Sequence, residues 1–104
     1  MNLSQENWTS QLENDLNAVV IDVRTEEEYQ EGIIAGAKNI DIYKGQEFID
    51  MLETLDKSKN YYVYCKAGSR SEQACAILNQ IGFENAFNLI GGFSNWAGPS
   101  ILPH

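Results

Sequence analysis

One short segment of the sequence brings together residues that could perform nucleophilic chemistry. Residues 61–64, YYVY, favour a strand, which ends at Cys65, and helix-forming residues begin within a few positions. A thiol at such a corner lies beside backbone N–H groups that have no partner inside the helix. Those amides, the helix dipole and nearby cations stabilise a thiolate relative to a thiol. We therefore predict that Cys65 is a nucleophile.

The residues after the thiol suit an anion held against the sulfur. Lys66 and Arg70 supply two positive charges within a few residues of the thiol. The intervening residues are small enough for the backbone to curl around a bound atom: Ala67, Gly68 and Ser69. Such a run of amides forms a nest for an anion. The alternative, a structural cysteine that closes a buried strand, would explain Cys65 but neither the glycine nor the two cations.

Histidine and metal chemistry fit this sequence poorly. Its single histidine is His104, the last residue, so a Cys–His pair would require the chain end to fold back onto the thiol. Structural zinc needs more sulfur and nitrogen ligands than the two cysteines provide. We predict no metal site and no cofactor.

Strands and helices alternate along the chain, and their arrangement would place the thiol. Apolar or alternating patterns predict strands at residues 18–23, 37–42, 61–65 and 86–90. Helical spacing and capping residues predict helices at 8–16, 25–32, 45–56 and 69–82. The pattern indicates the α/β class, with a mainly parallel sheet of four to five strands and helices on both faces. No clear first strand precedes residue 8, so the sequence predicts the four central strands and does not decide whether there is a fifth.

Ligands of such sheets bind at the carboxyl ends of the strands. Asp22 and Arg24 stand at one of these ends. They either line the mouth of the site or form an ion pair that orients a loop. Gly91 and Gly92 would let the chain turn tightly beneath the thiol loop.

Other side chains have plainer interpretations. Cys75 falls beside the apolar stripe of its helix and is expected in the core rather than as a partner of Cys65. Trp96 is expected to plug the core. Glu26, Glu27 and Glu28 are interpreted as a solvated helix start.

Length and charge limit the possible partners. The 104 residues are enough for one domain, residues 1–104, and 43% of them are hydrophobic. A formal net charge of −8 argues against nucleic acid and anionic membranes as partners. The start of the sequence has neither the basic nor the apolar region of a secretory signal, so the cytoplasm is the expected compartment.

Residues 61–98 resemble the thiol-bearing half of a single-domain rhodanese, a thiosulfate sulfurtransferase. Residues 19–40, VVIDVRTEEEYQEGIIAGAKNI, are similar to the first signature of the same family. The resemblance implies a rhodanese-like fold, with Cys65 as the sulfur acceptor and residues 66–70 as the loop that cradles a persulfide. The same resemblance implies that Ser71 opens the helix that follows this loop. It also implies a small anionic sulfur donor and a thiol or protein-cysteine acceptor. One departure is residues 32–37, GIIAGA, where the family usually has a histidine in place of Ile33.

Two alternatives to this enzyme remain open. One is a carrier or non-catalytic module of the same family that docks to a protein partner. The other is a cysteine phosphatase or arsenate reductase, which the same fold also hosts. Those enzymes resemble Cys-x5-Arg, whereas Cys65 to Arg70 is Cys-x4-Arg and Ser71 stands where their arginine would be. The shorter spacing favours a cradle for one sulfur atom over one for a tetrahedral oxyanion.

Overall fold

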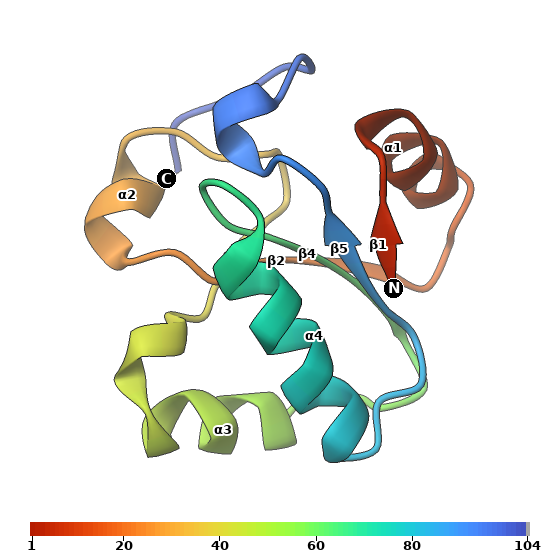
Figure 1. The fold of residues 1–104 in the computed structure, drawn as a ribbon, viewed down its shortest axis with the longest axis vertical. Helices are drawn as coiled ribbons and strands as arrows, with labels where there is room; N and C mark the ends of the chain where they lie inside the picture. Colours follow the sequence, from red (N-terminus) through yellow and green to blue (C-terminus); the bar gives the residue numbers. More distant parts are fainter. Residues whose placement is uncertain (104) are drawn as a thin grey trace.

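The computed structural model describes residues 1–103 and is built around a parallel β-sheet (Figure 1). The five strands are β1 (Asn2–Leu3), β2 (Ala18–Asp22), β3 (Lys38–Asn39), β4 (Asn60–Tyr64) and β5 (Ala86–Leu89). They lie in the order β1-β5-β4-β2-β3, and every neighbouring pair is parallel. The prediction of a mainly parallel sheet is confirmed. The sheet has five strands, the larger of the two numbers predicted from the sequence. The carboxyl ends of β2, β4 and β5 therefore meet at one edge.

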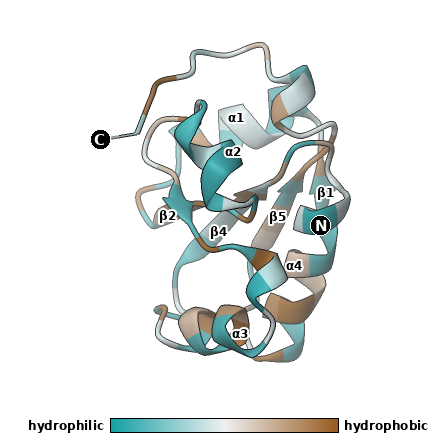
Figure 2. Ribbon diagram, turned by 90° about the vertical axis from the view of Figure 1, so that its left-hand side faces the viewer, coloured by the Kyte–Doolittle hydropathy of each residue, from teal (hydrophilic) through white to brown (hydrophobic). Residues whose placement is uncertain are grey.

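Helices cover both faces of this sheet, as predicted. They are α1 (Gln5–Glu13), α2 (Glu26–Gln30), α3 (Gln46–Glu53) and α4 (Ser69–Gln80), with short 3-10 turns η1 (Ile42–Lys44) and η2 (Phe93–Asn95). Alternate residues of a strand face opposite sides. Ile21 and Val63 thus pack with α3 and α4, whereas Val20 and Tyr62 pack with α1 and α2. In Figure 2, α2 is hydrophilic along its length, while α3 mixes both characters.

The N-terminal segment differs from its prediction. The edge strand β1 was not identified, because two residues are too short to show the alternation that marks a strand. The first helix begins earlier than expected, at Gln5, since the Ser4 side chain accepts a hydrogen bond from the Asn7 amide and caps it. It also ends earlier, and Leu16, predicted on its apolar face, is fully exposed beyond the helix.

The segment between β3 and α3 also corrects two expectations. The strand predicted at 37–42 is only two residues long, because Asp41 accepts a hydrogen bond from the Tyr43 amide and starts η1. In α3, Phe48 and Leu52 are buried as expected. Met51, predicted on the same face, is 47% exposed.

The helix after the thiol follows its prediction closely. It spans Ser69–Gln80, with Ala74 and Leu78 buried against the sheet. Cys75 is 4% exposed, which confirms its assignment to the core. Within residues 1–103, no helix has both the length and the apolar character needed to cross a bilayer.

Candidate active site

The sulfur of Cys65 lies where β4 ends and α4 begins. Its Sγ accepts hydrogen bonds from the Gly68 amide at 3.0 Å and from the Ser71 hydroxyl at 3.3 Å. Gly68 is the N-cap of α4 and provides no side-chain cap. The first amides of the helix therefore have no internal competitor for an anion at the sulfur. The residue is 1% exposed, so the sulfur lies at the base of its loop.

The two cysteines have opposite acidities. Burial raises the pKa of the Cys65 thiol, but hydrogen bonds from Ser71, Gly68 and Ala67 outweigh burial and leave the pKa below its ordinary value. At Cys75 burial dominates and raises the pKa to about 11. Cys65 is thus the more acidic of the two thiols, and Cys75 stays protonated near neutral pH.

The loop is fixed from below by the turn after β5. The amides of Phe93 and Ser94 donate to the carbonyls of Cys65 and Lys66 at 2.8 and 2.9 Å. Gly92 makes this approach possible, because a Cβ there would lie 2.5 Å from the Lys66 carbonyl oxygen. With these carbonyls tied beneath the loop, the amides of the following residues are free to face the sulfur. The predicted turn beneath the loop is present, and Gly92 makes its closest approach.

The two loop cations have different surroundings. Both terminal nitrogens of Arg70 donate to the Glu28 carboxylate, at 2.7 and 3.0 Å, and its guanidinium lies over the Tyr43 ring. The interpretation of Glu28 as merely solvated is therefore wrong. Lys66 is exposed, and no carboxylate of residues 1–103 lies within ion-pair distance of it. Lys66 is the loop cation whose charge is available to a ligand.

Glu28 could have been identified from its capping motif but not from its charge partner. Its side chain accepts from the Thr25 amide, closing the capping box predicted for α2, and the same carboxylate binds Arg70. The hydrogen bond from Arg70 lowers the pKa of Glu28 to about 2. A single carboxylate thus joins the start of α2 to the start of α4, forty-two positions apart in sequence.

We expect Glu28→Gln to lower the free energy of unfolding by about 0.5–1 kcal/mol at neutral pH, since the ion pair is only partly exposed. Glutamine can still cap α2, so the loss reports the charge. Because folding lowers the pKa of this group, its contribution is complete above about pH 4.5 and fades as the pH falls toward about 2. Urea unfolding at neutral and acidic pH measures the difference. A difference that persists unchanged at the acidic end would contradict this explanation.

Asp22 and Arg24 form a buried ion pair, and the Arg24 side chain also borders a hollow beside the thiol loop. Arg24 donates to the Asp22 carboxylate at 2.6 Å and to the Gly32 carbonyl at 2.7 Å. Its guanidinium also lies 4.6 Å from the centre of the Phe93 ring, next to the turn that supports the thiol loop. Of the two roles considered, the observed contacts are those of an ion pair that orients loops.

The segment without the family's usual histidine is held by other contacts. Besides Arg24, the Tyr64 hydroxyl accepts from the Ile34 amide at 3.1 Å. Ile33 and Ile101 exchange two backbone hydrogen bonds, at 2.8 and 3.0 Å. These bonds hold the segment in place without a histidine side chain at position 33.

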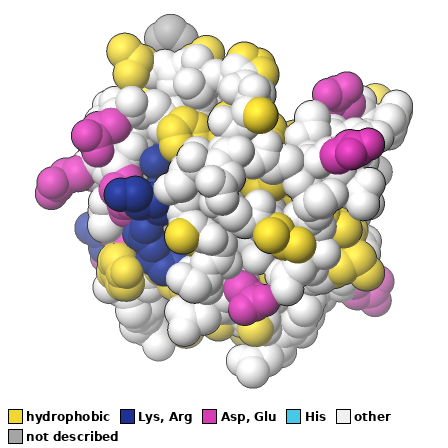
Figure 3. Space-filling model, turned by 45° about the horizontal axis from the view of Figure 1, so that its top comes forward, with side chains coloured by type: hydrophobic (Ala, Val, Ile, Leu, Met, Phe, Trp, Pro, Cys, Tyr) yellow, Lys and Arg dark blue, Asp and Glu magenta, His cyan; other side chains and the backbone are white. Residues whose placement is uncertain are grey.

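An open hollow of about 310 Å³ lies beside the thiol loop. It is lined by Arg24, Glu28, Glu31, Lys66, Phe93 and Ser94. In Figure 3, Lys and Arg side chains gather at one place on this face, while Asp and Glu side chains are scattered around them. The lining of the hollow has two cations and two carboxylates, and Lys66 is the cation among them that has no carboxylate within ion-pair distance in residues 1–103.

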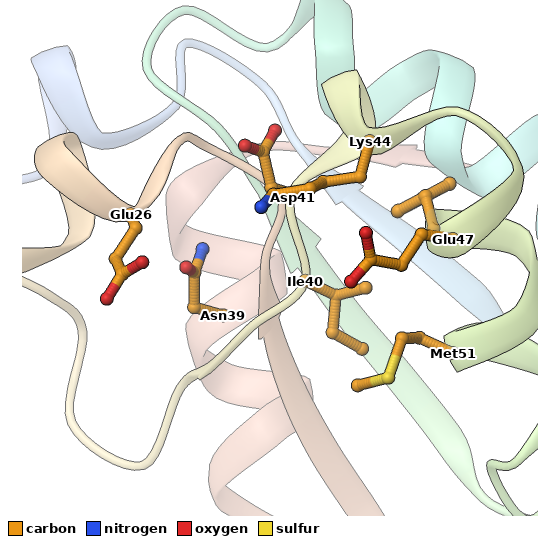
Figure 4. Close-up of a pocket in the computed structure, with 8 residues that line it drawn as sticks. Glu26, Asn39, Ile40, Asp41, Lys44, Glu47 and Met51 are labelled. Carbon is orange, nitrogen blue, oxygen red and sulfur yellow. The ribbon is translucent and has the colours of Figure 1, made fainter.

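A second pocket, shown in Figure 4, lies apart from the thiol. Ile40 and Phe48 form its buried apolar part, and Glu26, Asp41 and Glu47 contribute carboxylates around it. No residue of the thiol loop lines it. In the part of the chain that the structure describes, no three His, Cys, Asp or Glu side chains are grouped to hold a metal ion. His104 lies outside the described residues.

Comparisons with known proteins agree on one family. The model of the rhodanese-like domain matches residues 5–99. A protein of Bacillus subtilis described as a putative sulfurtransferase, YtwF, is 38% identical over 84% of this chain and 81% of its own length. The thiosulfate sulfurtransferase GlpE of Coxiella burnetii is also 38% identical, over 75% of this chain and 70% of its own. The crystal structure of a rhodanese-like domain protein from Staphylococcus aureus superposes with a TM-score of 0.84 at 27% identity, covering 99% and 98% of the two chains.

Proposed function

This chain belongs to the family of rhodanese-like domains, and we propose that it is a sulfurtransferase that carries a sulfane sulfur as a persulfide on Cys65. The donor is a small anion such as thiosulfate, and the acceptor is a thiol or a protein cysteine. We further propose that residues 1–104 act as one domain, without a cofactor, in the cytoplasm. Two observations support this: the family match spans nearly the whole chain, and both cysteines are free thiols.

The observation that carries the proposal is the position of the Cys65 sulfur. It receives two hydrogen bonds at the N-terminal end of α4, and they lower the pKa of the thiol. A thiolate held this way is a nucleophile without a neighbouring histidine. The same donors would stabilise the negative charge of a persulfide.

In the first half-reaction, the Cys65 thiolate attacks the outer sulfur of thiosulfate. A new S–S bond forms on Cys65 while the S–S bond of the donor breaks, and sulfite leaves with the bonding electron pair. The terminal sulfur of the resulting persulfide carries the negative charge. We assign the loop amides of residues 66–70, with Gly68 already bonded to Sγ, to the stabilisation of that charge.

In the second half-reaction, an acceptor nucleophile attacks the outer sulfur of the persulfide. Cyanide serves in an assay, and a thiolate would serve in a cell. The acceptor gains the sulfur, and Cys65 leaves as the thiolate from which the cycle began. The sulfur passes from donor to acceptor with no net gain or loss of electrons, so the cycle needs no external oxidant or reductant.

The charges around the loop suit an anionic donor. Lys66 is exposed beside the hollow and has no carboxylate partner within residues 1–103, so we assign it the attraction of the donor. The ion pair with Glu28 neutralises much of the charge of Arg70. We assign Arg70 a supporting role, in which its remaining positive field favours the thiolate.

The loop spacing separates sulfur transfer from phosphate chemistry, and this is the test of the proposal. We expect the wild-type protein to transfer sulfur from thiosulfate to cyanide, measured as thiocyanate, and to show no hydrolysis of aryl phosphates. Ser71, whose hydroxyl donates to the sulfur, occupies the sequence position at which a phosphatase has its oxyanion-clamping arginine. Arg70 instead forms an ion pair with Glu28.

Inserting one glycine between Ala67 and Gly68 restores the longer spacing and provides a matched comparison. It should cut sulfur transfer sharply, because it moves the Gly68 amide away from Sγ. Aryl phosphate hydrolysis through Cys65 at a rate comparable to sulfur transfer in the wild-type protein would show that the spacing argument is wrong.

A further inference from the structure

The hydroxyl of Ser71 has two possible acceptors but only one hydrogen. Its oxygen lies 3.3 Å from the Cys65 sulfur and 3.2 Å from the Gly68 carbonyl oxygen. A serine hydroxyl donates one hydrogen bond at a time. The sulfur therefore gains this bond only when the hydroxyl turns away from the Gly68 carbonyl.

The Gly68 carbonyl is already supplied with other donors. The Glu72 amide donates to it at 3.1 Å, as the first helical bond of α4. The side-chain amide of Asn88 donates to it at 3.2 Å. A carbonyl oxygen has two lone pairs, and these two donors occupy both.

Asn88 is built into the sheet in a way that fixes the direction of its NH₂ group. It lies in β5, is 3% exposed, and donates its other hydrogen to the Asn2 side-chain oxygen at 3.0 Å. Its own oxygen is buried and has no hydrogen-bond partner among the described residues. Turning the amide over would place this oxygen against two acceptors, the Asn2 oxygen and the Gly68 carbonyl, which is unfavourable.

We propose that Asn88 is a positioning residue that, by occupying the Gly68 carbonyl, directs the Ser71 hydroxyl onto the Cys65 sulfur. Asn88 does not touch the sulfur itself and acts through Ser71. An unpartnered buried oxygen is costly to retain, and a role for the NH₂ end explains why an asparagine, rather than an apolar residue, lies at this point of β5. The inference rests on the proposed function only for its consequence in sulfur transfer, because the geometry concerns the thiolate alone.

The test is a double-mutant cycle on the thiolate, measured without a substrate. The thiolate absorbs in the ultraviolet, so its fraction can be followed against pH, with the spectrum of the matching Cys65→Ser protein subtracted. The measurement uses a Cys75→Ser background, although that thiol, with a pKa raised to about 11, contributes little near neutrality. Arg70, the α4 cation whose charge acts on the sulfur, is present in every variant. Its partner Glu28 is also unchanged.

We expect Asn88→Ala and Ser71→Ala each to lower the thiolate fraction at neutral pH by roughly three- to tenfold, the usual net effect of losing one hydrogen bond. The double variant should fall no further than Ser71→Ala alone, because both changes remove the same bond. Asn88→Leu, which keeps the branched shape and the number of side-chain heavy atoms, guards against a cavity effect. Asn2→Ala removes the other bond of Asn88 and should leave the titration close to that of the background protein.

Two outcomes would overturn the proposal. One is a background-like titration in the folded Asn88 variants, with folding checked by circular dichroism. The other is an Asn88→Ala effect that adds in full to that of Ser71→Ala. Neither depends on turnover, so a wild-type protein that titrates as expected but accepts no sulfur would refute the proposed function and leave the role of Asn88 standing.

Discussion

Replacing Cys65 by serine is expected to abolish sulfur transfer from thiosulfate to cyanide. The serine hydroxyl keeps nearly the same shape at the base of the loop and can still accept from the Gly68 amide. It is not ionised near neutral pH, however, and cannot hold a sulfane sulfur as a persulfide. The expected loss is complete within the sensitivity of a thiocyanate assay, because covalent transfer has no alternative nucleophile in this loop.

The control for this variant is Cys75→Ser, which alters the other thiol. Cys75 lies on α4 and is buried in the protein core. Burial raises its pKa to about 11, so it supplies no thiolate near neutral pH. We expect this protein to keep most of the wild-type turnover, with only a modest loss of stability from placing a hydroxyl in an apolar site. Substantial turnover by Cys65→Ser, or loss of turnover in a folded Cys75→Ser, would refute the assignment of the nucleophile.

The second large effect is expected from Gly92→Ala, although Gly92 touches no substrate. The added Cβ would lie 2.5 Å from the Lys66 carbonyl oxygen and 2.6 Å from that of Cys65. These carbonyls belong to the loop whose amides face the sulfur. The backbone must move, and the two hydrogen bonds from Phe93 and Ser94 that fix the loop must lengthen. We expect a loss of roughly 2–4 kcal/mol in the free energy of unfolding, from overpacking and a strained backbone.

Because the loop loses its geometry, sulfur transfer should fall at least tenfold even at temperatures where Gly92→Ala is folded. Gly45→Ala is a matched control, since Gly45 has a φ of 60° against 59° for Gly92, but an added Cβ there meets nothing within 4 Å. It should lose only the roughly 1–2 kcal/mol due to backbone strain and keep its activity. Equal effects of the two substitutions on turnover would mean that contact with the thiol loop is not the cause.

The helices and strands that have strong local sequence patterns could be predicted from the sequence. β2 and β4 are continuous apolar or aromatic runs, and α4 has both a helix start at residue 69 and an apolar stripe. The edge strand β1 has two residues and no such signal. It is held by pairing with β5 and by the N-terminal amine, which donates to the Ala86 carbonyl, and these contacts exist only in the folded chain.

Only the part of the candidate site that is formed by residues close together in the sequence was predictable. The grouping of a thiol, small residues and two cations at 65–70 can be read directly, and the structure brings Gly68 and Ser71 to the sulfur. The Glu28–Arg70 pair and the Asn88–Gly68 bond join residues 42 and 20 positions apart. Such contacts depend on how the sheet edge and the helix ends meet, which local spacing does not specify.

The remaining alternative within the family is a sulfur carrier that serves a protein partner. It would use the same thiolate and the same loop as an enzyme that acts on small donors. The two differ in rate. A carrier would accept sulfur but pass it to cyanide slowly, and a non-catalytic binder would not accept sulfur at all.

The central claim is that Cys65 holds the transferred sulfur as a persulfide, and the intact mass after incubation with thiosulfate tests it most directly. We predict a gain of one sulfur atom in the wild-type protein, located on the peptide that contains Cys65 and lost again on addition of cyanide. Cys75→Ser should show the same gain, and Cys65→Ser none. An unchanged wild-type mass after exposure to thiosulfate, in a folded protein with its thiols reduced, or a gain of sulfur on Cys75 instead, would contradict the claim.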